Sequence, residues 1–245
     1  MRTPISISLS KAKKSTVGKC LMLAGIALLT VLMVKLGFWQ LARAEYKTRM
    51  LEVWQRPAQT LSVDSQPGQK VVFSGRIVKQ HYLLLDNRTR AGKAGYEVLA
   101  LVQPELKQPM IVVNLGWHQA DSDRALLPQL VLPANRIEFE GWLKPVRKNF
   151  VLAEAPWSKA WPKRVQSLTP HKLAMAFERD VVFSALLLQE KPLLEGLVTQ
   201  WKAVGMSPQR HKGYAVQWFA LALTLLLLTV WFCRRQRSGG EANEV

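Results

Sequence analysis

Hydrophobic positions gather in two long, nearly unbroken stretches, one toward each end of the chain. The first covers residues 20–41 and the second covers residues 214–233. Each is about 20 residues long, and at about 1.5 Å per helical residue it spans the roughly 30 Å of a bilayer core. The pattern therefore predicts two transmembrane helices.

The first stretch has a second interpretation, a cleaved signal peptide. A basic leader precedes it, and Ala42-Arg43-Ala44 loosely resembles a cleavage site. However, the stretch exceeds the roughly 7–15 residues of a signal-peptide core, and an arginine fits a small-residue cleavage site poorly. The sequence favours a retained membrane helix.

Basic residues flanking the two stretches predict the orientation. Residues 1–19 carry five Lys and Arg side chains, and residues 234–245 carry three. The positive-inside rule then places both tails in the cytoplasm, and residues 42–213 outside, because a segment much longer than about 60 residues crosses largely regardless of its charge. The short leader favours a bacterial plasma membrane with a periplasmic domain. The mitochondrial inner membrane is the alternative.

Between the stretches the pattern changes to short segments rich in β-branched and aromatic residues, separated by Gly and Pro. Such segments are typical of strands. We expect strands at 71–77, 82–85, 96–102, 110–116, 137–143 and 181–188, helices at 42–56 and 170–179, and an irregular basic loop at 144–169. The predicted fold is a membrane protein in which two transmembrane α-helices flank a β-rich (α+β) extramembrane domain.

The composition changes this picture in two ways. The formal net charge of +17 suits anionic lipid and acidic protein partners. Nucleic acid is not expected as a partner, because the chain has membrane spans and carries no recognisable nucleic-acid motif. The two cysteines, Cys20 and Cys233, lie in the apolar stretches, so the outer domain holds no cysteine and is predicted to have no disulfide. They are also too far apart for a CxxC motif.

Enzyme chemistry finds little support in the sequence. The chain has no HExxH, Walker A, GxGxxG or GxSxG motif, and its four histidines are not spaced as metal ligands. We therefore do not expect an enzyme.

One candidate interaction surface is a basic loop between two predicted strands, which carries Arg88, Arg90 and Lys93. A long hairpin with glycines at positive φ and exposed basic side chains is the favoured interpretation. The functional alternative is a cationic loop that binds an acidic partner.

The second candidate is the entry to the second apolar stretch. On a helix His211 shares a face with Tyr214 and Trp218. The histidine is an interfacial polar residue with two aromatic anchors, a residue that packs on the outer domain, or a ligand to a metal or haem iron. In the last case Arg210 and Lys212 lie where haem propionates need cations.

Four sequence blocks, in this order, resemble the surfeit-locus family of cytochrome c oxidase assembly proteins: LGFWQLARAEYK, LLLDNRTRAGKAGYEVLALV, VVNLGW and HKGYAVQWFALAL. The resemblance extends from the first apolar stretch to the second. It departs from the family pattern at Tyr46, at Leu115 and at Lys212, where members often have Trp, Arg and an apolar residue.

The resemblance implies a non-catalytic membrane protein that assists maturation of oxidase subunit I, with haem a synthase as a further possible partner. It also implies transient binding of haem a, with His211 as the axial ligand of the iron. If the two spans pack side by side, Trp39, Gln40 and Arg43 lie at the depth of His211, and one site is expected between the two helix mouths. The alternative is a protein-binding scaffold that binds no haem, for which the Arg88–Lys93 loop matters more.

Overall fold

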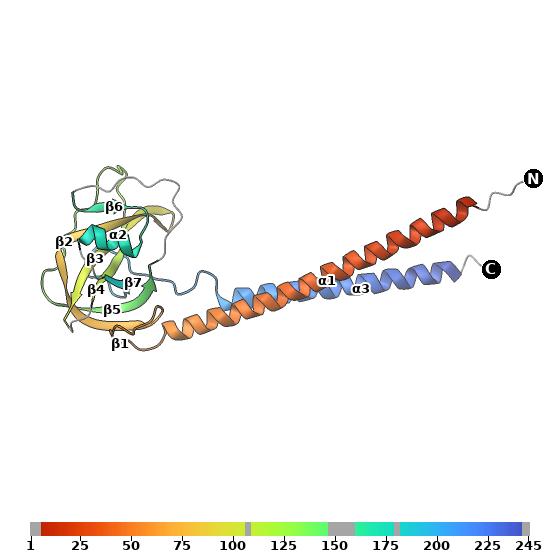
Figure 1. Ribbon diagram of the computed structural model, residues 1–245, viewed down its shortest axis with the longest axis horizontal. Helices are drawn as coiled ribbons and strands as arrows, with labels where there is room; N and C mark the ends of the chain where they lie inside the picture. The colour runs from red at the N-terminus through yellow and green to blue at the C-terminus, as the bar shows by residue number, and fades with distance from the viewer. Residues whose placement is uncertain (1–5, 106–108, 147–159, 179–181, 242–245) are drawn as a thin grey trace, which may run out of the picture. The chain divides into compact units, whose positions relative to one another are not determined.

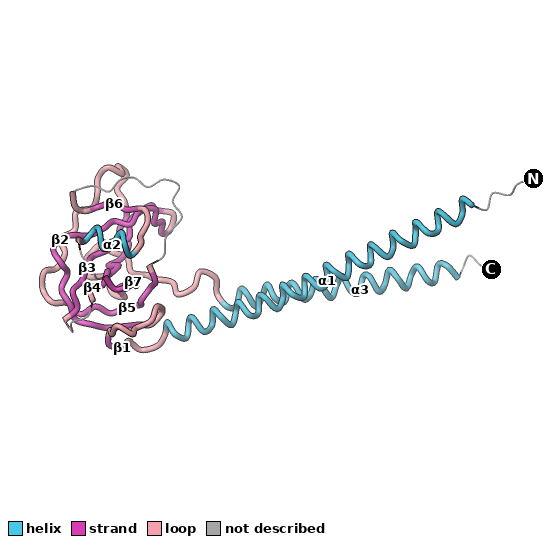
Figure 2. Tube along the Cα trace, in the orientation of Figure 1, coloured by secondary structure: helices cyan, strands magenta, loops and turns pink. Residues whose placement is uncertain are grey.

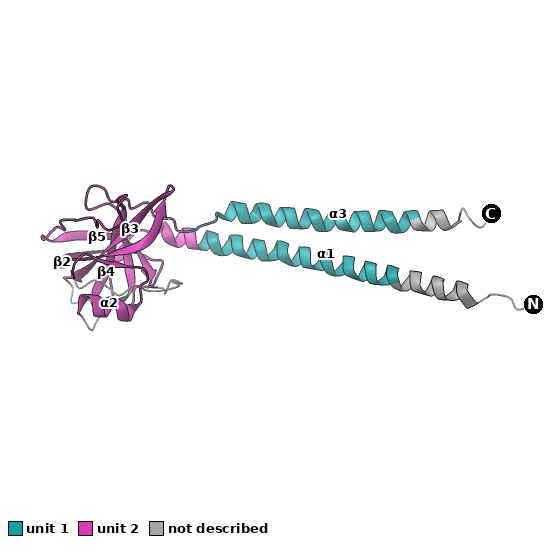
Figure 3. Ribbon diagram, turned by 90° about the horizontal axis from the view of Figure 1, so that it is seen from above, with its two compact units in different colours: residues 1–49, 204–245 teal, residues 50–203 magenta. Residues whose placement is uncertain are grey.

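The computed structural model describes residues 6–105, 109–146, 160–178 and 182–241 (Figure 1). The chain divides into two compact units, one of residues 1–49 with 204–245 and one of residues 50–203 (Figure 3). Helix makes up the first unit, and nearly all the strands and loops belong to the second (Figure 2).

Two long helices build the first unit. Helix α1 runs from Ser6 to Trp54 and helix α3 from Pro208 to Glu241. Both are long and apolar enough to cross a membrane. The predicted continuation of the first helix beyond the apolar stretch is confirmed, because α1 reaches Trp54 without a break; its last residues belong to the second unit.

The two helices pack along a seam that repeats every 3.5 residues. The less exposed positions include Ile26, Thr30, Met33, Gly37, Gln40 and Ala44 on α1, and Pro208, His211, Ala215, Trp218, Ala222, Leu225 and Thr229 on α3. Steps of three and four alternate along both helices, as in a coiled coil. The helices are antiparallel, because Gln40 contacts His211 while Ile26 lines a groove with Leu225 and Thr229.

Small residues hold the helices close in the half of the seam that contains His211. A Cβ added to Gly37 would come within 2.6 Å of the Phe219 ring. Ala44 and Ala215 are each only 1% exposed. Small residues at such positions let membrane helices approach closely, so van der Waals packing can hold them together where no hydrophobic force does.

The second unit is a mixed β-sheet that closes on itself. Its elements are β1 (Gln59–Thr60), β2 (Lys70–Arg90), β3 (Lys93–Pro104), β4 (Met110–Gln119), β5 (Ile137–Pro145), β6 (Lys163–Val165), α2 (Pro170–Phe177) and β7 (Val182–Gln189). The strands follow the order β1-β2-β3-β4-β7-β5, and β5 pairs again with β2. Strands β2, β3, β4, β7 and β5 therefore form a ring, while β1 and β6 pair with β2 beside it.

Both faces of this sheet are covered. Alternate residues of β2 point to opposite sides: Tyr82 and Leu84 join one buried cluster, and Leu83 and Leu85 join another. The first cluster gathers side chains from all five strands of the ring, and the second is covered by α2 and β6. Because both faces are buried, the central strands are nearly continuous apolar runs and do not alternate between apolar and polar residues.

The expected β-rich fold is confirmed, with two corrections. The strands expected at 71–77 and 82–85 are parts of one strand, β2, with a register shift between Ile77 and Tyr82. Lys79 lies in that interval at a φ of 58°, so a bulge rather than a turn interrupts the apolar pattern. The loop expected at 144–169 contains strand β6, while residues 147–159 of it lie outside the described residues.

Candidate functional site

The strongest candidate site is a hydrogen-bonded pair between the two long helices. His211 lies in the first turn of α3, and its side chain faces α1 with the residue only 8% exposed. Its Nδ1 lies 2.7 Å from Oε1 of Gln40, which is half-buried on α1. The structure thus brings together two residues that are 171 positions apart in the chain.

This contact defines the roles of the two ring nitrogens of His211. An amide oxygen only accepts hydrogen bonds, so in this arrangement Nδ1 is the donor and Gln40 Oε1 the acceptor. In the neutral ring with its proton on Nδ1, the other nitrogen, Nε2, carries the lone pair. No described residue forms a hydrogen bond with Nε2. Nε2 is also absent from the fully buried side-chain atoms without a partner among the described residues, so this nitrogen has some access to the surface.

Small residues surround the pair. Ala44 and Ala215 are its buried neighbours along the seam.

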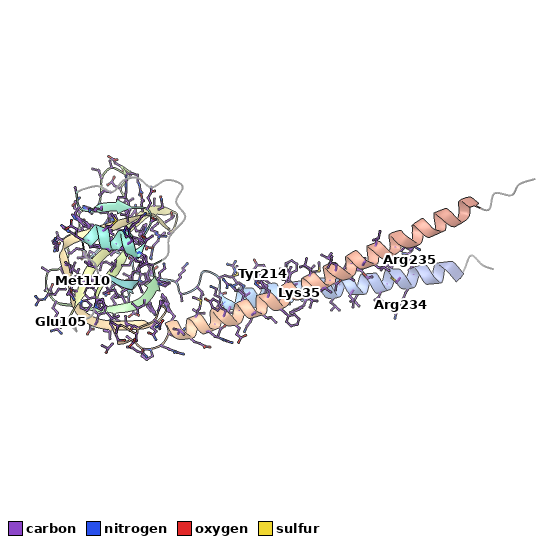
Figure 4. The ribbon with its side chains drawn as sticks, in the orientation of Figure 1. Lys35, Glu105, Met110, Tyr214, Arg234 and Arg235 are labelled. Atoms are coloured by element: carbon purple, nitrogen blue, oxygen red, sulfur yellow. The ribbon has the colours of Figure 1, made fainter. Side chains whose placement is uncertain are left out.

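The other residues predicted for this site lie around the pair rather than in it. Trp39 is 57% exposed, while Trp218 is half-buried on the seam. Tyr214, labelled on α3 in Figure 4, is 42% exposed. Arg43 is exposed, with its guanidinium 5.3 Å from the centroid of the Tyr46 ring. Of the six residues expected at the helix mouths, His211 and Gln40 are the two that the structure joins by a hydrogen bond.

The surroundings of the pair are positively charged. Arg43, Arg210 and Lys212 are all exposed on this part of the two helices. The acidic residue nearest in sequence, Glu45, forms an ion pair with Arg49 one turn along α1. An anionic group close to His211 thus meets several cations.

With one histidine as its only metal-ligating side chain, the pair suits a metal that is already held in an organic complex better than it suits a free metal ion. No group of three or more His, Cys, Asp or Glu side chains among the described residues is placed to hold a metal. One neutral imidazole is what haem iron needs as an axial ligand, and exposed cations suit its propionates. These residues would suit a haem, with His211 as the residue that would ligate its iron and Arg43, Arg210 and Lys212 as the cations that would face its propionates.

The second candidate, the basic loop, is a tight β-hairpin. Strands β2 and β3 are joined through Ala91 and Gly92, both at positive φ, as the favoured interpretation of this stretch requires. Lys93 is exposed on it, whereas Arg88 and Arg90 are half-buried.

Both arginines of the hairpin have partners within their own unit. Nε of Arg88 lies 3.8 Å from Oε1 of Glu97. Nη1 of Arg90 donates to the Gln200 carbonyl at 3.0 Å, and its guanidinium lies 4.8 Å from the Trp201 ring centroid. Burial lowers the pKa of Arg90, and the charge of Glu97 partly opposes this shift. Lys93 is the basic residue of the hairpin that is most available to another molecule.

The sequence did not predict the polar network that lies beside this hairpin. The Asn114 side chain, 1% exposed, donates to Glu97 Oε2 at 2.8 Å and accepts from the Gly116 amide at 3.2 Å. The indole of Trp117 donates to the Arg88 carbonyl at 2.8 Å. These residues belong to the two middle blocks of the family resemblance, so those blocks meet on adjacent strands. The stretch Ile111 to Trp117 stands out in the sequence, but the interpretation it favours is a buried strand and its turn, because a lone Asn in an apolar strand carries no motif.

Comparison with protein-family models matches residues 27–223 to the SURF1 family. No curated protein matches the chain. The matched region begins in the first apolar helix, includes the whole β unit with the Asn114 network, and ends in the second apolar helix beyond His211. Because the match covers well over half of the chain, this protein belongs to the SURF1 family, whose members are non-enzymatic assembly factors of cytochrome oxidase.

Proposed function

We propose that this protein assists haem a delivery to oxidase subunit I by binding the haem transiently at the paired mouths of its two membrane helices. The observation that carries the proposal is the buried His211–Gln40 pair, which leaves one imidazole nitrogen free at the helix surface. Bound haem a supplies an iron centre that takes an axial nitrogen donor, together with an apolar tail and two anionic propionates.

The site matches these parts of the ligand one by one. His211 Nε2 is the axial donor, and the exposed cations Arg43, Arg210 and Lys212 suit the propionates. The exposed aromatic rings of Trp39 and Tyr214 provide apolar surface beside the charges. A single histidine ligand gives a finite affinity, which a carrier needs if it is to release its cargo to another protein.

The proposed placement in the membrane follows the charge pattern. Residues 20–41 and 214–233 cross the bilayer, the tails 1–19 and 234–245 lie in the cytoplasm, and residues 42–213 lie in the periplasm of a bacterial plasma membrane. His211 then lies near the outer interface, where a ligand that is half apolar and half charged is most stable. Oxidase subunit I is the proposed recipient, and haem a synthase is a proposed donor.

The experiment is an absorption spectrum of the detergent-purified protein, expressed in a host that makes haem a. We expect a Soret band in the wild type and its loss in His211→Ala. His171→Ala is the matched control, because His171 is an exposed histidine of the β unit. We expect this control to keep the wild-type spectrum.

Two outcomes overturn the proposal. A colourless wild type under haem-replete conditions excludes a haem carrier, and an unchanged band in His211→Ala excludes the site. In the first case the protein acts as a scaffold that binds subunit I or haem a synthase without haem. Co-purification of subunit I with Lys93→Glu then tests the exposed cation of the hairpin, and we expect the scaffold to lose its partner in that variant.

A further inference from the structure

The contact between His211 and Gln40 assigns a role to the glutamine as well as to the histidine. We propose that Gln40 is a positioning residue, which fixes the proton of His211 on Nδ1 and so presents the Nε2 lone pair to an incoming metal complex. The inference rests on the proposed function for the identity of the ligand. The state of the histidine ring itself can be measured without any ligand.

The geometry supports a firm contact. The separation of 2.7 Å between Nδ1 and Oε1 is short for a hydrogen bond from nitrogen to oxygen. His211 is buried to 8% exposure and Gln40 is half-buried, so water competes weakly for either group. In a surrounding of low dielectric constant, breaking this bond leaves an unpaired donor and an unpaired acceptor, and each then bears its full desolvation penalty.

The local packing fixes both side chains. Gln40 and His211 occupy positions of the 3.5-residue seam, so each projects between the helices rather than along the surface. Ala44 on α1 and Ala215 on α3 flank the pair, and each is 1% exposed. The close approach of the helices that these alanines permit brings the amide within reach of the ring.

The chemistry of this arrangement is that of a metal-binding histidine whose second nitrogen is held by a protein acceptor. Such acceptors fix the tautomer and the ring orientation and raise the basicity of the ligating nitrogen. The neutral imidazole ring in water carries its proton mainly on Nε2, which blocks that atom as a ligand. Gln40 therefore reverses the tautomer preference of His211 before any ligand arrives.

The first test measures the tautomer directly in the ligand-free protein. Nitrogen-15 NMR of histidine-labelled protein, in detergent at neutral pH, distinguishes protonated from lone-pair nitrogens of the ring. We expect the proton of His211 on Nδ1 in the wild type and in Gln40→Glu, which keeps an acceptor. In Gln40→Leu, which has none, we expect the proton to move to Nε2.

The second test measures ligand binding, with haem b as the probe and the Soret band as the signal. Loss of an outer partner of a metal ligand typically weakens binding about 10- to 100-fold, and we expect a loss of that size in Gln40→Leu. Gln40→Glu should bind about as tightly as the wild type and show a lower midpoint potential, because a carboxylate draws the Nδ1 proton more strongly. The matched control is Gln217→Leu, the same substitution at an exposed position of α3.

The outcomes separate this inference from the proposed function. A proton on Nε2 in the wild type, or equal haem affinity of wild type and Gln40→Leu, overturns the positioning role. A wild type that has its proton on Nδ1 but binds no haem overturns the proposed function and leaves the role of Gln40 in setting the tautomer intact. A thermal unfolding curve of Gln40→Leu that matches the control shows that the helices remain packed.

Discussion

At the scale of single residues, the structure holds a second histidine in an unusual setting, on the β unit. The ring of His81 stacks on Trp161 with 4.3 Å between centroids, and Lys163 lies over the same indole. Burial lowers the pKa of His81, and the charges of Lys79 and Lys163 lower it further, while Glu178 opposes them. The folded protein thus favours the neutral ring.

This environment predicts that acid weakens the β unit through His81. Because the folded pKa lies below the unfolded value of 6.5, the stabilisation is complete above pH 6.5 and is lost as the pH falls below it. We expect the melting temperature to fall less in His81→Phe than in the wild type between about pH 7.5 and about pH 5. Circular dichroism of the β unit measures this, with the exposed His171→Asn as control. An equal decrease in all three proteins contradicts the prediction.

The sequence predicted some of these single-residue features and not others. His211 was singled out, because a histidine at the mouth of an apolar helix stands out, but only the family resemblance favoured it as a ligand. Gln40 was placed at the same depth only on the condition that the spans pack side by side, and its contact with the ring was not foreseen. The hydrogen bond of Asn114 was not predicted, because its partner Glu97 lies 17 positions away and only strand pairing brings the two together.

At the scale of secondary-structure elements, the two long helices behave as a closely packed pair. Gly37 lies against the Phe219 ring, whereas a Cβ at Gly25 meets no atom within 4 Å. The Phe219 ring in turn packs edge-on against Phe38, with centroids 5.2 Å apart. This difference between the two glycines gives a matched pair of variants.

We expect Gly37→Leu to push α1 and α3 apart and so to weaken the His211–Gln40 contact. Overpacking costs about 1–3 kcal/mol, and about 1.4 kcal/mol is tenfold in binding, so haem b affinity should fall about 10-fold or more. Gly25→Leu should bind like the wild type. The measurement is the Soret titration of both variants in the same detergent. Equal affinities would show that the close approach at Gly37 does not support the site.

Closure of the sheet depends on another glycine, Gly141 on β5. A Cβ there would lie 1.9 Å from the carbonyl oxygen of Leu188 on β7. Because that oxygen belongs to the backbone, it cannot move without separating the two strands.

We therefore expect Gly141→Ala to destabilise the β unit by about 3 kcal/mol, at the upper end of the usual cost of overpacking. Gly205→Ala is the control, since a Cβ there meets open space. Urea denaturation followed by circular dichroism compares the two variants. A wild-type midpoint for Gly141→Ala contradicts the close approach of β5 and β7.

The elements differ in how far the sequence predicted them. The helices and most strands follow from length, apolar runs and turn residues. The helix seam does not, because residues of these spans are apolar on every side and the contact face is marked by small size rather than by hydrophobicity. The closure of β2 onto β5 also could not be predicted, because the two edges that meet are distant in the chain and β2 contains a bulge.

At the scale of the whole molecule, the proposed topology leads to a direct labelling experiment. In a Cys20→Ser, Cys233→Ser background, a single cysteine at Lys93→Cys lies on the exposed hairpin of the β unit, and one at Ser238→Cys lies in the proposed cytoplasmic tail. A membrane-impermeant maleimide added to intact spheroplasts should label the first cysteine only. Opening the plasma membrane should add the second. Labelling of the tail in intact spheroplasts contradicts the orientation.

The wide separation of Gln40 and His211 in the chain has a consequence for the order of events during synthesis. At about 5–20 residues per second, the 171 positions between them take roughly 10–35 s to translate. Until the second helix is made and inserted, a nascent chain has the amide but no histidine to pair with it. The β unit comes entirely between the two, so a protein truncated after β7 has that unit but not the His211–Gln40 pair. Under the proposed function, haem loading would be restricted to finished molecules, and an abandoned chain would not withhold haem from the oxidase.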